Sequence, residues 1–288
     1  MPTFLFDQTI FGPVISRRLG ISLGINLLPN DSKLCSFDCI YCECGWNPEK
    51  GSIKAVLPSR KEVESRLRKK LEVMRSEGNL PDVITFAGNG EPTLHPDFAG
   101  IIDDTMQIKN ELCPEARIAV LSNSTMLHKP KVVEALKKVD DNILKLDSGI
   151  TETIFILDQP VGRFDLQKVV NNLKLFDGKL IIQTMFIRGS FNGTTIDNTT
   201  EPELEAWIAL LLQIRPKSVM IYTIARDTPA NDLRKVSTEE LETIAVRVRN
   251  VTGLEVQVCG WEGRSDGNAV YGTSPTGFNV NSHGQNPW

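Results

Sequence analysis

The sequence lacks several features that would assign it to common protein classes. None of its apolar runs is long enough to span a bilayer, so we expect no membrane anchor. Residues 1–7 carry neither a basic region nor a long apolar stretch, which argues against a secretory signal peptide. An excess of basic charge is also missing, since the formal net charge is −4. The overall composition therefore gives no indication of nucleic-acid binding, and we expect no DNA partner.

The cysteines lack the pattern of a disulfide framework. The chain has six of them, of which Cys113 and Cys259 stand alone in the sequence. Cysteines without a paired framework suit a reducing compartment, so we expect a cytoplasmic protein. The chain has 288 residues and is 41% hydrophobic, which is enough for one large domain or two small ones. No internal repeat of fixed period is present.

The other cysteines lie close together, and three of them, Cys35, Cys39 and Cys42, have the spacing C-x3-C-x2-C. A loop of this length can wrap three thiolates round one face of a small inorganic cluster. It cannot easily pair them, because a disulfide needs a specific separation of Cα atoms and a third thiol would be left over. Three thiolates hold three corners of a [4Fe–4S] cube, whereas a closed electron-transfer cluster takes four. The pattern therefore predicts a cluster with one open iron, and an open position is typical of catalytic metal sites.

Two alternatives to this interpretation remain open. A zinc knuckle or a group of buried structural thiols would also place cysteines in a loop, but zinc sites usually show C-x2-C pairs with a second pair downstream. Cys44 is the second complication, because a fourth thiolate would close the open iron. We expect Cys44 to be a non-ligating thiol in a turn with Gly45 and Trp46. Loss of the cluster in a Cys44→Ala variant would contradict this assignment.

Strands and helices are expected to alternate along the chain. Apolar runs and capping residues predict strands over residues 21–26, 82–87, 117–121, 142–147, 179–187, 218–223 and 254–258, and helices over 59–77, 97–112, 129–138, 165–176, 201–214 and 237–250. Each crossover is long enough for the next strand to return parallel. Six βα units and an extra edge strand predict an α/β fold, an open partial (βα)6 TIM-like barrel. We expect residues 1–20 to be irregular, residues 1–260 to form one barrel domain, and residues 261–288 to be an irregular or disordered tail.

Glycine and polar residues follow the predicted strands at the end where parallel barrels place their sites. They are Gly90 and Glu91, Ser122 and Asn123, Lys145 and Asp147, and Gln183 and Met185. Each pair has an ordinary structural explanation: a glycine turn, short polar turn formers, a salt bridge at the barrel rim, and core filling. His95 is expected to be a packed or surface histidine. Tyr222, Thr223 and Arg226, at the end of the sixth strand, are candidates for substrate contact. Arg17 and Arg18 are by default a solvated pair, with contact to an anionic substrate as the alternative.

Taken together, these motifs resemble the radical S-adenosylmethionine (SAM) superfamily. The cysteine spacing fits, as does the aromatic Tyr41 before the third cysteine. Residues 88–93 resemble the GGEP motif of that family, with Asn89 in place of its first glycine. The resemblance implies that SAM chelates the fourth iron of a [4Fe–4S] cluster. One electron from the cluster then cleaves SAM to methionine and a 5′-deoxyadenosyl radical, which abstracts a hydrogen atom from substrate.

The resemblance also implies roles for individual residues. Cys35, Cys39 and Cys42 would ligate iron, and Tyr41 would lie beside the adenine of SAM. The residues expected to bind SAM or to face it in the barrel are Gly90, Glu91, Ser122, Asn123, Asp147, Gln183 and Met185.

Several segments look like one branch of the superfamily, the Fe–S oxidoreductases similar to wyosine-base synthetases. These segments are residues 12–20, 145–147, 183–185 and 222–224. Wyosine-base synthetases remodel a methylated guanosine in tRNA, so the resemblance makes tRNA one candidate for a substrate that the sequence does not identify. It also implies an external one-electron donor of the flavodoxin or ferredoxin type, since no cysteine pair for a second cluster is present. Alternatives are the modification of a peptide or small molecule and, in another class, a non-catalytic Fe–S or zinc-binding regulatory module.

Overall fold

A computed structural model describes residues 4–16, 20–49, 51 and 55–259. Within these residues, one large sheet has eight strands: β1 (Ile10–Ser16), β2 (Gly20–Ile25), β3 (Val83–Phe86), β4 (Arg117–Ser122), β5 (Asp141–Lys145), β6 (Ile181–Met185), β9 (Ser218–Tyr222) and β11 (Glu255–Cys259). The strands lie side by side in this same order. From β2 to β11 every neighbouring pair is parallel, which confirms an α/β fold with a mostly parallel central sheet.

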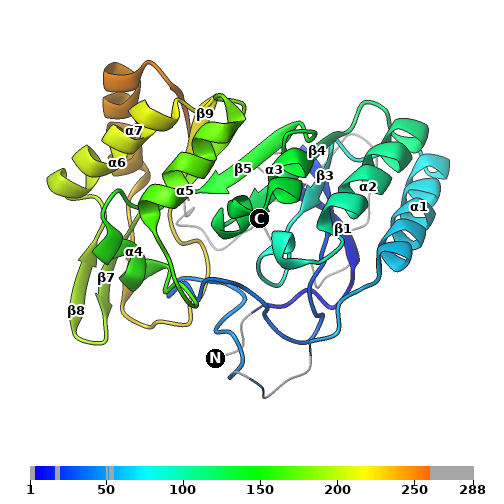
Figure 1. The fold of residues 1–288 in the computed structure, drawn as a ribbon, viewed down its shortest axis with the longest axis horizontal. Helices are drawn as coiled ribbons and strands as arrows, with labels where there is room; N and C mark the ends of the chain where they lie inside the picture. Colours follow the sequence, from blue (N-terminus) through cyan, green and yellow to red (C-terminus); the bar gives the residue numbers. More distant parts are fainter. Residues whose placement is uncertain (1–3, 17–19, 50, 52–54, 260–288) are drawn as a thin grey trace, which may run out of the picture.

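Helices connect the parallel strands. They are α1 (Arg60–Ser76), α2 (Phe98–Leu112), α3 (Pro130–Leu136), α4 (Thr151–Leu157), α5 (Leu166–Leu173), α6 (Glu201–Ile214) and α7 (Thr238–Thr252). In Figure 1 they follow the sheet from α1 at one end to α6 and α7 at the other. Apolar side chains such as Leu67, Phe86 and Trp207 are fully buried in the core that contains both layers. Six of the seven helices were expected from the sequence, because their apolar residues recur at helical spacing.

Local capping explains where two of the helices begin. Before α1, the Ser59 side chain accepts a hydrogen bond from the Glu62 backbone N–H. Before α7, Ser237 and Glu240 form a full capping box, in which each side chain bonds the other residue's backbone N–H. These bonds satisfy N–H groups that have no partner inside the helix.

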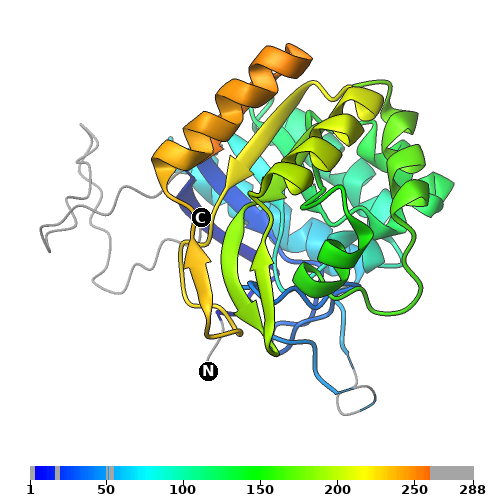
Figure 2. The ribbon, with the colours of Figure 1, turned by 90° about the vertical axis from the view of Figure 1, so that its left-hand side faces the viewer.

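Two predictions about where strands occur are wrong. Residues 1–20 were expected to be irregular, yet Ile10–Ser16 form β1, which pairs antiparallel with β2 at the edge of the sheet. Residues 179–187 were expected to be one strand, yet β6 ends at Met185. Ile187 then begins a second sheet of three antiparallel strands, β7 (Ile187–Phe191), β8 (Thr194–Asp197) and β10 (Leu233–Lys235). Figure 2 shows this second sheet beside the main one.

The change of sheet after β6 is fixed by Asn198. Its side-chain oxygen accepts from Ile187 N at 2.9 Å, and its amide donates to the carbonyls of Met185 and Asp147 at 2.8 and 3.0 Å. Asn198 is 1% exposed. A buried amide satisfied in this way replaces the main-chain bonds that a continuing strand would have made.

Some predictions fall outside the described residues. The expected tail over residues 261–288 and the candidate residues Arg17 and Arg18 belong to segments that the structure does not describe, and the single-domain prediction for residues 1–260 stays a prediction. Within the described residues, none of the helices combines the length and the apolarity needed to cross a membrane.

Candidate functional site

The cysteine loop, residues 35–45, lies across the carboxyl ends of the parallel strands. Leu34 forms a parallel bridge with Gly90, which follows β3, and Phe37 forms an antiparallel bridge with Pro160. At Gly90 the backbone has φ +134°, and an added Cβ would lie 2.0 Å from the Leu34 carbonyl oxygen. Glycine is therefore needed at this position, because only a residue without a side chain lets the loop approach so closely.

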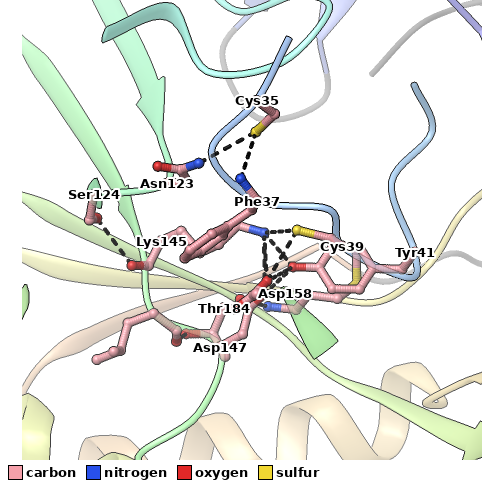
Figure 3. A network of polar contacts seen from close by, with 12 residues as sticks. Cys35, Phe37, Cys39, Tyr41, Asn123, Ser124, Lys145, Asp147, Asp158 and Thr184 are labelled. Atoms are coloured by element: carbon pink, nitrogen blue, oxygen red, sulfur yellow. Dashed lines mark hydrogen bonds and ion pairs between the residues drawn. The ribbon is translucent and has the colours of Figure 1, made fainter. Parts of the chain in front are cut away.

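Nitrogen donors surround the sulfur atoms of the loop. The Cys35 sulfur lies 3.5 Å from the Phe37 backbone N and 3.4 Å from Asn123 Nδ2, and the Cys39 sulfur lies 3.5 Å from Lys145 Nζ (Figure 3). Burial raises the pKa of the Cys35 thiol to about 12. Cys39 is buried and Cys35 and Cys42 are partly buried, so thiolates at these positions are costly without nearby positive charge. The N–H and ammonium groups supply part of that charge, and the irons of a cluster would supply the rest, so this donor set fits a [4Fe–4S] cluster.

The fourth cysteine of the loop acts as a hydrogen-bond donor. The Cys44 thiol bonds the Cys42 sulfur, which lowers the pKa of Cys42 and raises that of Cys44. The Cys44 sulfur also lies 3.5 Å from the Gly88 carbonyl oxygen. A thiol that stays protonated is a poor metal ligand, because the thiolate is the ligating form. This geometry supports a non-ligating Cys44.

A structural zinc site needs its ligands arranged round one ion. Among the residues that the structure describes, no three His, Cys, Asp or Glu side chains are arranged round one point in this way. A cluster makes a different demand, since each thiolate binds its own iron.

A buried polar group, which we call the Tyr41 cluster, adjoins Cys39. It consists of Tyr41, Lys145, Asp147 and Asp158 (Figure 3). The Tyr41 hydroxyl bonds Lys145 Nζ, Asp147 and, at 3.0 Å, Asp158. Lys145 Nζ is 3.3 Å from a carboxylate oxygen of each aspartate. The sulfur of Cys39 in turn lies 3.2 Å from Asp158 Oδ1.

The Tyr41 cluster keeps Lys145 charged. Burial opposes the ammonium form, but Asp147, Cys39 and Asp158 act against it and hold the pKa of Lys145 well above its usual value. Burial raises the pKa of Asp147, partly offset by the Lys145 charge. Lys145 is therefore a fixed cation beside Cys39 and a poor nucleophile, since only a neutral amine attacks.

Glu91 links the second predicted motif to the cysteine loop. Its carboxylate accepts from Thr93 N at 3.0 Å, Ser122 Oγ at 2.9 Å and Asn123 N at 2.6 Å, and it also bonds the Thr93 hydroxyl. The side chain is buried, and burial raises its pKa despite these donors. Through Asn123, whose amide reaches Cys35 and Ser36, Glu91 positions the loop after β4 against the first cysteine.

Asn89, which departs from the GGEP pattern, is fully buried. Its amide exchanges two hydrogen bonds of 2.8 Å with the main chain of Phe6 and donates to the Pro29 carbonyl at 2.7 Å. The side chain therefore fastens the amino-terminal segment to the end of β3, which a glycine cannot do.

We expect Asn89→Gly to lower the free energy of unfolding by about 2–3 kcal/mol, because three hydrogen bonds worth about 1 kcal/mol each are lost. Chemical denaturation would measure the change. The matched control is Asn231→Gly, which makes the same substitution at an exposed turn position. Equal stability of the two variants would contradict a fastening role for Asn89.

The remaining predicted residues fall into two groups. Gln183 and Met185 are 8% and 6% exposed, and Met185 belongs to the hydrophobic cluster that contains Tyr41. Thr223 accepts from Val236 N, Arg226 pairs with Glu43 at 2.6 Å, and the ring nitrogens of His95 bond the Pro58 carbonyl and Asp97 N. These three side chains thus have structural partners, and the expectation that His95 is packed is confirmed.

The sequence analysis missed two side chains of this site. Asp158 follows the short helix α4, which was not expected, and main-chain bonds from Asp38 N to the Asp158 carbonyl bring it to the cysteine loop. Lys33 precedes the first cysteine by two residues, and no motif marks it. Only its burial and partners in the folded chain reveal it.

Comparison with family models and curated proteins gives three matches of note. The model of the radical SAM superfamily matches residues 30–176. A UPF0026 protein of Helicobacter pylori (strain ATCC 700392 / 26695) is 30% identical over 236 residues, covering 81% of this chain and 71% of the relative. A Brachyspira hyodysenteriae protein named GTPase Obg is 30% identical over 268 residues, covering 92% of this chain. The present chain spans only 37% of that protein's length.

Solved structures show the same fold at low identity. A radical SAM methyltransferase from Sphaerobacter thermophilus superposes with a TM-score of 0.60 at 14% identity, covering 83% of this chain and 65% of that one. Streptococcus suis SuiB bound to S-adenosylmethionine superposes with a TM-score of 0.57 at 15% identity, covering 80% and 49%. The present chain thus spans about half of SuiB.

Proposed function

We propose that this chain, which belongs to the radical SAM superfamily, uses Cys35, Cys39 and Cys42 to ligate the cluster of that superfamily. Enzymes of the superfamily employ a [4Fe–4S] cluster and SAM. The observation that carries the assignment is the set of N–H and ammonium donors that lie beside the sulfur atoms of Cys35 and Cys39 in one loop, at the carboxyl ends of parallel strands. When bound and reduced, the cluster supplies one electron that cleaves SAM to methionine and a 5′-deoxyadenosyl radical.

The residues round the loop have distinct tasks in this proposal. Gly90 lets the loop lie against the end of β3, and Glu91 holds Ser122 and Asn123 in one orientation. These four residues form the proposed face for SAM beside Cys35. Tyr41 and Asp147 form the other side of the site, next to Cys39. Asp147 accepts a hydrogen bond from Met185 N, and Gln183 lies two residues before Met185 on β6.

The Tyr41 cluster also indicates what kind of substrate reaches the site. A charged lysine and two carboxylates at one end of the barrel suit a polar substrate that offers both donors and acceptors. Burial of this group excludes water, which protects a reactive radical from side reactions. A nucleotide of tRNA, the substrate of the wyosine-base synthetases that the chain resembles, is the substrate we propose. A peptide is the second candidate.

The proposed cluster is tested by reconstitution without oxygen. We expect about four irons and four sulfides per chain, and a change in the electron paramagnetic resonance (EPR) spectrum of the reduced cluster when SAM is added. A spectrum that SAM leaves unchanged would contradict an open iron and would favour the electron-carrier or regulatory class.

The substrate is tested by binding of unmodified tRNA at several salt concentrations. An RNA partner predicts an affinity that falls steeply with salt, because bound counterions are released from the phosphates. Affinity that is weak and independent of salt would exclude tRNA and leave the peptide or small-molecule alternative.

A further inference from the structure

Lys33 is an unusual side chain for its position. Lysine is almost never buried unless it is paired, and this side chain is only 1% exposed. Its Nζ donates to Asp38 Oδ1 at 3.0 Å and to the Gly45 carbonyl at 2.8 Å, and both acceptors belong to the cysteine loop. The ammonium is therefore enclosed by the same short loop that carries the three proposed ligands.

The Lys33 ammonium lies within the loop that carries all three thiols. It is two residues before Cys35 and is bonded to Asp38, the residue that precedes Cys39. Asp38 does not simply neutralise the cation, because its side chain is 24% exposed to water and also accepts from Asn47 N. The loop thus encloses a positive charge that is bonded to two of its own residues and only partly neutralised.

We propose that Lys33 sets the reduction potential of the cluster by stabilising its reduced form. The step is a one-electron transfer: an external donor such as a flavodoxin loses one electron, the cluster gains it, and no proton or bond is exchanged. This inference rests on the proposed assignment of Cys35, Cys39 and Cys42 as ligands.

The physical reason is the low screening of buried charge. Reduction adds one negative charge within the loop, and a fixed cation nearby stabilises that charge by an energy that grows as the local dielectric falls. Salt screens buried pairs much less than exposed ones. The reduction potential of iron–sulfur clusters is known to follow the net charge around them, to which Lys33 contributes.

A purely structural role is the competing explanation, since Lys33 also ties Asp38 to Gly45. An electrostatic role predicts that two substitutions, one at Lys33 and one at Asp38, shift the reduction potential in opposite directions. Lys33→Met removes a positive charge, so we expect the reduction potential to fall. Asp38→Asn removes a negative charge beside the same loop while keeping an oxygen acceptor, so we expect the potential to rise.

The experiment is a potentiometric titration of the reconstituted cluster, followed by EPR. We expect Lys33→Met to make one-electron reduction about tenfold less favourable, a shift of about 59 mV to more negative potential. Lys69→Met, the same substitution at an exposed position of α1, is the matched control and should leave the potential unchanged. Lys33→Arg keeps the charge and should stay near the wild-type value.

The outcomes separate this inference from the proposed function. Failure of the wild-type protein to bind iron and sulfide would overturn the cysteine assignment itself. A loaded cluster whose potential is the same in the wild type, Lys33→Met and Asp38→Asn would overturn the role of Lys33 alone. If Lys33→Met does not bind a cluster, Asp38→Asn decides: a raised potential supports the inference, and an unchanged one contradicts it.

Discussion

Replacement of Cys39 by alanine is expected to abolish the iron–sulfur cluster. Cys39 is 6% exposed and its sulfur lies between Lys145 Nζ and Asp158, so no water or neighbouring thiol can easily take its place. Two thiolates are too few to hold a cube that already has one open corner. We expect iron and sulfide per chain to fall at least tenfold, measured after reconstitution without oxygen.

Two other cysteines provide controls for this result. Cys113→Ala removes a buried thiol that lies at the end of α2, far along the chain from the loop, and should leave the iron content unchanged. Cys44→Ala should also keep the cluster, because Cys44 lies outside the three-cysteine spacing and its thiol donates to the Gly88 carbonyl at 3.5 Å. Loss of iron in Cys44→Ala would make Cys44 the fourth ligand and would close the site to SAM.

Replacement of Glu91 by alanine should produce the largest loss of stability. The carboxylate accepts hydrogen bonds from Thr93, Ser122 and Asn123, and all of these donors would be left without a partner in a buried place. A buried donor without an acceptor costs about 1–3 kcal/mol. We expect the free energy of unfolding to fall by about 3–5 kcal/mol, measured by chemical denaturation.

Glu91→Gln is the informative companion, because glutamine keeps one side-chain oxygen and the volume of glutamate. It should lose less than half as much stability as alanine. SAM affinity should nevertheless fall in Glu91→Gln, since Asn123 would no longer be held against Cys35 by a charged acceptor. A variant with wild-type SAM affinity would show that this network has no part in cofactor binding.

The parallel core of the fold follows from local sequence patterns. Apolar runs such as residues 83–86 are buried on every residue, as expected of a strand covered on both faces. The parts that sequence reasoning missed depend on contacts between distant residues. Helix α4 buries only Ile154 and Leu157, too few apolar positions to show a helical period. Strand β1 carries Gly12 and Pro13, which interrupt a strand pattern and are tolerated at a sheet edge.

In the candidate site, too, local patterns were predicted from the sequence and contacts between distant residues were not. The spacing of Cys35, Cys39 and Cys42 is local, so the sequence alone predicted them. Asp158 could not be predicted, because it reaches the site through a main-chain pairing across more than a hundred residues. The functions of Asn89 and Glu91 as fasteners likewise depend on partners that only the folded chain brings together.

Formation of 5′-deoxyadenosine tests the central claim most directly. The protein is reconstituted without oxygen, reduced with dithionite and mixed with SAM, and the products are separated by chromatography. We predict equal amounts of 5′-deoxyadenosine and methionine from the wild type and none above background from Cys39→Ala. Intact SAM in the presence of a fully loaded, reduced wild-type cluster would contradict the assignment of this chain's site to radical chemistry.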